Sequence, residues 1–357
     1  MRTTSVVLML LAIGCAAPPE LAEEAVGEHA VVAPPELAAS HQMRTLRVGD
    51  LSMRVAEQGD GPLVLLLHGF PESWYSWRHQ LPALATAGFK VVAPDMRGYG
   101  STDAPPAVED YAIDRLCADV TGLINAYGEE QAVVVGHDWG ALVAWQCTLL
   151  APDRVRAVAA LSVPYSGRAD IRPTDAWKRQ FGEAFFYILY FQEPGVAEAE
   201  LDADPRTVLR RVYASPTTAR DEPEVTDPLA AAGGWSKRMG HPTEWPSWLT
   251  EEDLDYYAGE FDGVSFRGGL SYYRNFDRNW EMLADVDPVI PRPALFIAGA
   301  EDGVIGGTAK EALVERMSPL VRDLRGVHLI PDTGHWTQQE RPDAVNRLLV
   351  EFLEGLQ

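Results

Sequence analysis

Short apolar runs alternate with longer segments of helical periodicity along most of the chain. The apolar runs cover residues 63–67, 90–93, 132–135, 157–161, 294–298 and 327–330. Continuous runs of this length are typical of strands that a parallel sheet buries on both faces. Helical periodicity covers residues 78–87, 111–127, 141–150, 308–317 and 342–356. We therefore predict an α/β fold, with a mostly parallel sheet and helices on both faces.

Two further features complete the predicted organisation. Residues 44–48 and 51–58 are typical of a β-hairpin that turns at Gly49-Asp50. Residues 163–287 contain no buried-strand pattern, and 19 of the 33 Phe, Tyr and Trp residues fall between Thr174 and Asp287. Some of these rings must serve ordinary helix packing. We expect a helical cap domain at 163–287, inserted into an α/β core formed by residues 43–162 and 288–357.

The N-terminal segment has the pattern of an export signal. Residues 1–14 have a basic start at Arg2 and an apolar run from Val6 to Ile13, and Gly14 then precedes Cys15. The apolar run is too short to span a membrane. The segment resembles a bacterial lipoprotein signal, in which Cys15 would be acylated after cleavage. An ordinary secretory signal with an incidental Cys15 is the alternative. Residues 15–42 are rich in Ala, Pro and Glu and repeat APPELA, which indicates an extended tether.

Composition narrows the classes of partner. The formal net charge is −22, and a chain without a basic surface is a poor partner for nucleic acid. No metal-binding spacing of Cys and His occurs, so we expect no metal and no cofactor. Cys117 and Cys147 both fall in predicted helices, which does not indicate a disulfide framework. We expect a small lipophilic substrate and, through Cys15, attachment to a membrane of the bacterial cell envelope, on its periplasmic side or at the cell surface.

The candidate chemistry follows the predicted strands. GHDWG at residues 136–140 has the form of a nucleophile elbow, with Asp138 where esterases carry serine. Asp302 and His335 follow two later strands. Functional groups gather at the carboxyl ends of the strands in open α/β sheets, and the order nucleophile, acid, histidine is that of α/β-hydrolases. The sequence therefore predicts that Asp138, Asp302 and His335 form one catalytic site.

From about Met43 onward the chain resembles the α/β-hydrolase-fold epoxide hydrolases. The resemblance is carried by seven segments in the same order: HGFPESWYSWRHQ from His68, DMRGYGSTDAP from Asp95, GHDWG from Gly136, YILYFQEPGVAEAEL from Tyr187, SYYRNFDRNW from Ser271, AEDGV from Ala300 and GHWTQQERPDAVN from Gly334. It implies attack by Asp138 on an epoxide carbon. A serine would form an ether at that carbon, whereas an aspartate forms an ester that water can cleave.

The resemblance also assigns the remaining site residues. His335, oriented by Asp302, would activate the water that cleaves the ester. The N–H groups of Phe70 and Trp139 would form the oxyanion hole. Two tyrosines from the cap would donate a proton to the epoxide oxygen; the matching positions are Tyr187 and Tyr273, with Tyr190 and Tyr272 as the alternatives. We expect the side chains that contact the substrate to include those of His68, Pro71 and Trp336.

Three other functions fit part of the pattern. A haloalkane dehalogenase uses the same aspartyl ester, but such enzymes carry asparagine where Phe70 stands and lack the tyrosine pair. A fluoroacetate dehalogenase would have arginine in place of Trp139. The alternative that is not an enzyme is a surface lipoprotein that has a hydrolase fold without catalytic activity. Asp138 itself excludes a serine esterase.

Overall fold

A single sheet of eight strands forms the centre of the fold. The computed structural model describes residues 41–214 and 218–356. The strands are β1 (Gln42–Val48), β2 (Leu51–Gln58), β3 (Leu63–Leu67), β4 (Lys90–Pro94), β5 (Ala132–His137), β6 (Val155–Leu161), β7 (Ile290–Gly299) and β8 (Val321–Ile330). Their order across the sheet is β1-β2-β4-β3-β5-β6-β7-β8. Strands β1 and β2 are antiparallel to their neighbours and the other strands run parallel. The prediction of a mostly parallel sheet is confirmed.

The strands form where the apolar runs predict them. Every residue of β3 and β5 is buried, as expected for central strands covered on both faces. Val48 and Leu51 pair across the predicted hairpin turn, in which Gly49 takes a φ of 60°. Several strands are longer than predicted, β7 and β8 most of all. Strand β8 begins at Val321 and its first half includes exposed polar positions that carry no buried-strand signal.

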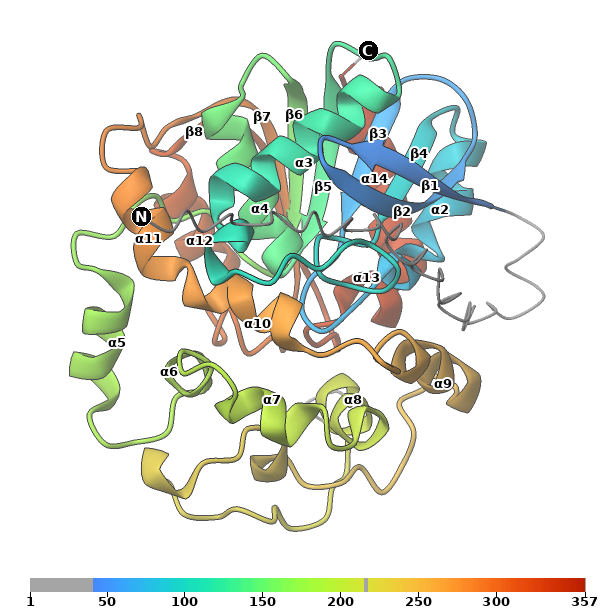
Figure 1. Ribbon diagram of the computed structural model, residues 1–357. Coiled ribbons are helices and arrows are strands. Elements are labelled where there is room, and N and C mark those ends of the chain that lie inside the picture. Colours follow the sequence, from blue (N-terminus) through green and yellow to red (C-terminus); the bar gives the residue numbers. More distant parts are fainter. Residues whose placement is uncertain (1–40, 215–217, 357) are drawn as a thin grey trace, which may run out of the picture. The chain divides into compact units, whose positions relative to one another are not determined.

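Helices cover both faces of the sheet. Helix α3 (Ile113–Ala126) packs on α4 (Trp139–Leu150), and α2 (Gln80–Thr86) packs on α14 (Pro342–Glu354). In Figure 1, α3 and α4 lie in front of the central strands. The core also contains η1 (Trp74–Trp77), η2 (Val108–Tyr111), α12 (Lys310–Met317) and α13 (Thr337–Glu340). Cys117 of α3 and Cys147 of α4 are buried free thiols.

A long insertion between β6 and β7 contributes the cap segments. Its helices are α5 (Pro173–Phe181), α6 (Tyr187–Tyr190), α7 (Val196–Leu201), α8 (Pro205–Tyr213), α9 (Glu251–Gly259), α10 (Arg267–Arg274) and α11 (Phe276–Met282). Figure 1 shows α5 to α10 gathered on one side of the sheet. Residues 218–250 contain only the short η3 (Ala230–Ala232) and η4 (Ser236–Arg238), because prolines and glycines interrupt this segment repeatedly. The insertion is therefore helical only in part.

Buried polar contacts attach this insertion to the core. The Arg54 guanidinium of β2 bonds the carboxylate of Asp95 in the core and that of Glu260 at the end of α9. Tyr75 donates its hydroxyl to Asp253 of α9 at 2.8 Å. Removing one member of such a buried pair leaves a charge without its counter-ion, so these contacts fix the cap segments strongly on the core.

The predicted signal, tether and lipidation site at Cys15 all lie outside the described residues, apart from the last two tether positions. Within residues 41–214 and 218–356, no helix has the length and apolar character needed to cross a bilayer.

The turn from β5 into α4 depends on two glycines that let backbone segments touch. A Cβ atom on Gly136 would lie 2.1 Å from the carbonyl oxygen of Gly140. A Cβ atom on Gly140 would lie 2.0 Å from the carbonyl oxygen of Leu67 in β3. Both contacts involve backbone atoms, so a side chain at either position forces α4 away from the sheet.

We therefore expect Gly140→Ala to lower the free energy of unfolding by about 3 kcal/mol, through overpacking. Chemical denaturation monitored by circular dichroism measures this difference. Gly355→Ala is the matched control, because its Cβ would meet only ordinary contacts at 3.4 Å. Equal stability of the two variants would contradict the role assigned to the close approach.

Candidate active site

Asp138 lies at the sharp turn between β5 and α4, with its carboxylate exposed to a cavity. Its backbone has a φ of 51°, a left-handed conformation that aspartate adopts at some cost and that is common at functional sites. The N–H of Phe70 donates to the Asp138 Oδ1 at 2.9 Å. The Trp139 N–H lies in the first turn of α4, where helix N–H groups lack an intrahelical acceptor. One carboxylate oxygen is thereby held in place from the loop after β3.

His335 stands between two carboxylates. Its Nδ1 lies 3.1 and 3.2 Å from the two oxygens of Asp302, and its Nε2 lies 3.7 Å from the Asp138 Oδ2. Burial lowers the pKa of the imidazole, but the charge and hydrogen bond of Asp302, followed by the charge of Asp138, outweigh it and raise the pKa to about 9. Burial also raises the pKa of the Asp302 carboxyl, but His335 reverses the effect and holds it below its usual value.

A cavity of about 360 Å³ joins these groups to the cap segments. It is lined by Phe70, Asp138, Tyr187, Val212, Ala214, Arg220, Trp235, Met239, Tyr273, Asp302, Gly303, Val304, His335 and Trp336. The rings of Tyr187 and Tyr273 lie 6.0 Å apart, edge to face. Burial, followed by the charge of Asp138, raises the pKa of both phenols well above the usual value. Both hydroxyls therefore keep their protons beside the carboxylate.

The two alternative tyrosines direct their hydroxyls elsewhere. Tyr190 donates to Glu200 at 2.9 Å, and Tyr272 donates to the Arg97 carbonyl oxygen at 3.0 Å. Neither residue lines the cavity that contains Asp138. The structure thus brings Tyr187 and Tyr273, rather than this second pair, to the same space as Asp138.

Of the three residues predicted to contact the substrate, only one lines the cavity. Trp336 lines the cavity, whereas His68 and Pro71 are not among its lining residues. The His68 ring is engaged with backbone groups, because Nε2 accepts the Met96 N–H and Nδ1 lies 2.9 Å from the Gly69 carbonyl oxygen. These contacts hold the loop that carries the Phe70 N–H.

A buried polar cluster behind Asp138 was not assigned any role from the sequence. Glu72 is fully buried and accepts hydrogen bonds from the Gly69 N–H and from the side chains of Gln338 and Gln339. Its other contact is His137 Nδ1 at 2.8 Å, and His137 Nε2 lies 2.8 Å from the His335 carbonyl oxygen. The cluster connects the loop after β3 to the backbone of His335. Its members occur in the HGFPES, GHDWG and HWTQQ segments, but only the fold brings these segments together.

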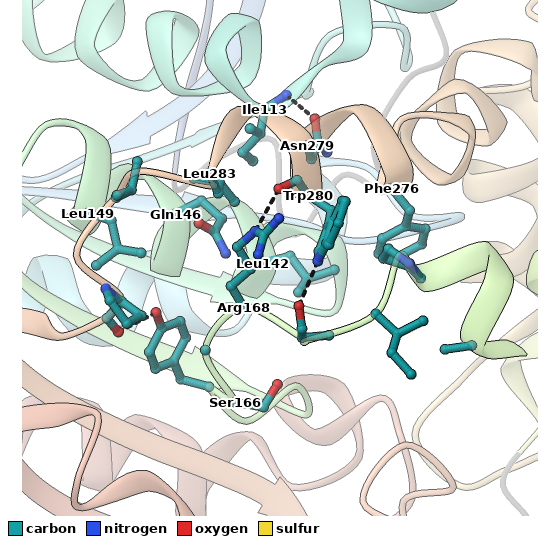
Figure 2. A pocket seen from close by; sticks show the side chains of 18 of the residues that line it. Ile113, Leu142, Gln146, Leu149, Ser166, Arg168, Phe276, Asn279, Trp280 and Leu283 are labelled. Carbon is teal, nitrogen blue, oxygen red and sulfur yellow. Dashed lines mark hydrogen bonds between the residues drawn. The ribbon is translucent and has the colours of Figure 1, made fainter.

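A second cavity, of about 280 Å³, is shown in Figure 2, and Trp139 is one of its lining residues. Its labelled lining residues include Leu142 and Gln146 of α4, Phe276 and Trp280 of α11, and Arg168. Neither Asp138 nor His335 lines it. Aromatic rings separate it from the first cavity, since Trp139 packs edge to face on Tyr273 with ring centres 5.1 Å apart.

The described residues were also compared with the ligand sets that bind metal ions. No group of three or more His, Cys, Asp or Glu side chains among those residues is arranged to hold a metal ion.

Comparisons with known proteins agree with this geometry. Residues 62–342 match the family model of the alpha/beta hydrolase fold. Epoxide hydrolase A of Mycobacterium tuberculosis is 49% identical over 318 residues, which cover 88% of this chain and 98% of that protein. The crystal structure of Epoxide Hydrolase A from Mycobacterium thermoresistibile is 47% identical, covers 89% of this chain and 99% of its own, and superposes with a TM-score of 0.80. An epoxide hydrolase from an endophytic Streptomyces is 43% identical over 89% of this chain and 96% of its own, with a TM-score of 0.81. The chain belongs to the epoxide hydrolases of the α/β-hydrolase fold.

Proposed function

We propose that this protein adds water to a small lipophilic epoxide, giving a vicinal diol, through a covalent ester on Asp138. In the first step a carboxylate oxygen of Asp138 attacks a ring carbon, and the bond from that carbon to the epoxide oxygen breaks. The negative charge that develops on this oxygen is met by a proton from Tyr187 or Tyr273. The product of the step is a hydroxyalkyl ester of Asp138.

In the second step His335 removes a proton from water, and the resulting hydroxide attacks the ester carbonyl carbon of Asp138. The oxyanion accepts hydrogen bonds from the N–H groups of Phe70 and Trp139. Its collapse expels the alkoxide of the diol, which takes the proton from the hydroxyl group left on the carboxyl carbon, and the Asp138 carboxylate is restored. Once ester formation has lowered its pKa, the protonated His335 passes its proton to the phenolate, and it then regains a proton from water, so the net reaction is epoxide plus water to diol.

The observation that carries this proposal is the pairing of an ionisable nucleophile with two protonated donors in one cavity. Tyr187 and Tyr273 line the same space as Asp138, and burial together with the Asp138 charge keeps their pKa values high. An epoxide has a poor leaving group that stays attached to its own substrate, so protonation of the oxygen is the requirement that distinguishes its opening from halide displacement.

We also propose that the protein is exported and held at a bacterial membrane by lipid on Cys15. The support is the sequence alone, namely the short basic and apolar segment before Cys15 and the proline-rich stretch after it. One acyl chain binds a membrane only weakly, so stable attachment requires the several chains that a lipoprotein cysteine carries.

Replacing both phenols tests the acid role. Each of Tyr187→Phe and Tyr273→Phe should lower the rate of ring opening by roughly 10²-fold, because one hydrogen-bond donor remains, and the double variant should lose nearly all activity. Diol formation from styrene oxide measures the effect. Tyr190→Phe, which removes a hydroxyl committed to Glu200, is the control that should keep wild-type activity. Full activity in the double variant would refute the assignment, and halide release from 1-chlorobutane at a matching rate would indicate a dehalogenase.

The two steps should respond differently to pH. In the free enzyme the Asp302 and Asp138 charges raise the pKa of His335 to about 9 against the opposing effect of burial. Ester formation neutralises Asp138, so the pKa of His335 should fall in the intermediate. We expect the rate of ester hydrolysis to rise with pH and to level off at a pH below the His335 pKa of the free enzyme. The rate of ring opening should not change with pH over the neutral range. Single-turnover rates of each step measure this. If the rates of both steps showed the same pH dependence, His335 would take part in ring opening as well.

Cys15→Ser tests the anchor. The variant should leave the membrane fraction or remain unprocessed, because serine has no thiol to carry the lipid. Cell fractionation followed by immunoblotting measures the distribution. If the variant partitions into the membrane as the wild type does, the anchor lies elsewhere.

A further inference from the structure

Arg220 lines the catalytic cavity but takes no part in the reaction described above. It belongs to the irregular cap segment between α8 and η3 and pairs with Pro242 in an isolated bridge. The side chain is half-buried and shares the cavity with Asp138, Tyr187, Tyr273 and His335. A permanently charged group in a largely aromatic cavity is costly unless something compensates it.

Backbone carbonyls hold the Arg220 guanidinium in place. Nη1 donates to the carbonyl oxygens of Arg211 at 2.9 Å and Gly240 at 3.3 Å, and Nη2 donates to that of Ala214 at 2.7 Å. These bonds use three of the five N–H donors of a guanidinium. The remaining donors, which include the Nε–H, have no protein acceptor among the described residues.

No carboxylate neutralises this charge. Within the described parts of the chain, Arg220 makes no salt bridge, whereas neighbouring cap arginines do: Arg211 pairs with Glu224 and Arg274 with Glu198. Burial lowers the pKa of Arg220 below its usual value, and no acidic neighbour raises it again. In a chain of net charge −22, a fixed cation left without an acidic partner in the catalytic cavity is a position prepared for an anion from outside the protein.

We propose that Arg220 binds the carboxylate of an epoxy acid and so makes the enzyme selective for epoxides that carry this group. The inference rests on the proposed epoxide hydrolysis at Asp138. The cavity walls suit such a molecule, since Val212, Trp235 and Met239 offer apolar surface to the chain between its two polar ends. Asp138 and Asp302 repel the carboxylate, which directs the epoxide end toward the nucleophile. The overall negative charge opposes entry only weakly, because salt screens charges beyond about 8 Å at physiological ionic strength.

The test compares terminal epoxy carboxylic acids of increasing chain length with the corresponding primary amides, which have nearly the same shape and no charge. The wild type should prefer the acid, and the preference should shrink as salt is raised. Arg220→Met should lower kcat/KM for the acid by roughly 10- to 100-fold, mainly by raising KM. Its kcat/KM for the amide should stay within about twofold of the wild-type value. Arg220→Lys should restore part of the preference.

Arg206→Met is the control, because it removes the same charge from α8 at an exposed site paired with Glu251 and Asp255. It should leave the ratio of acid to amide turnover unchanged. An equal loss on acid and amide in Arg220→Met would mean that Arg220 only supports the cap, and would overturn the inference. A wild type that hydrolyses both series alike would also overturn it, while leaving epoxide hydrolysis intact. Failure to hydrolyse acid, amide and styrene oxide alike would instead refute the proposed function.

Discussion

The site depends on keeping one carboxylate ionised and immobile beneath a layer of aromatic side chains. Asp138 is held by its left-handed backbone at the β5–α4 turn and by the N–H of Phe70. The imidazole of His335, whose pKa the two carboxylates raise to about 9 despite burial, supplies a balancing positive charge 3.7 Å away. In the proposed mechanism, ester formation removes the negative charge of Asp138, so the first step itself prepares His335 to lose its proton.

A second layer of buried polar groups fixes that pair from behind. Glu72 collects hydrogen bonds from the loop that carries Phe70 and from Gln338 and Gln339 of α13. His137, directly before the nucleophile, joins this carboxylate to the carbonyl oxygen of His335. A buried polar group that lacks a hydrogen-bond partner lowers the stability of the folded protein. These bonds hold the backbone around Asp138 and His335 in place, while the other side of the cavity is lined by residues of the cap.

The sequence predicted the core well because its signals are local. The continuous apolar run of β3 and the glycines around Asp138 each report directly on the structure formed there. Glu72 was not given a role, since its partners Gln338 and Gln339 lie 266 and 267 residues away. Arg220 could not be predicted either, because the lack of a neighbouring carboxylate is a property of the folded cap. The roles of Asp138, Asp302, His335, Tyr187 and Tyr273 stay predictions, although the fold brings all five side chains into one cavity.

The direct test of covalent attack is the source of the first oxygen added to the substrate. A single turnover in ¹⁸O-water with enzyme in excess should give largely unlabelled diol, because that oxygen comes from the Asp138 carboxylate, and should leave the label in the peptide that contains Asp138. Mass spectrometry of the diol and of the digested protein measures both. Fully labelled diol in the first turnover, with an unlabelled Asp138 peptide, would mean that water attacks the epoxide directly and that Asp138 serves only as a base.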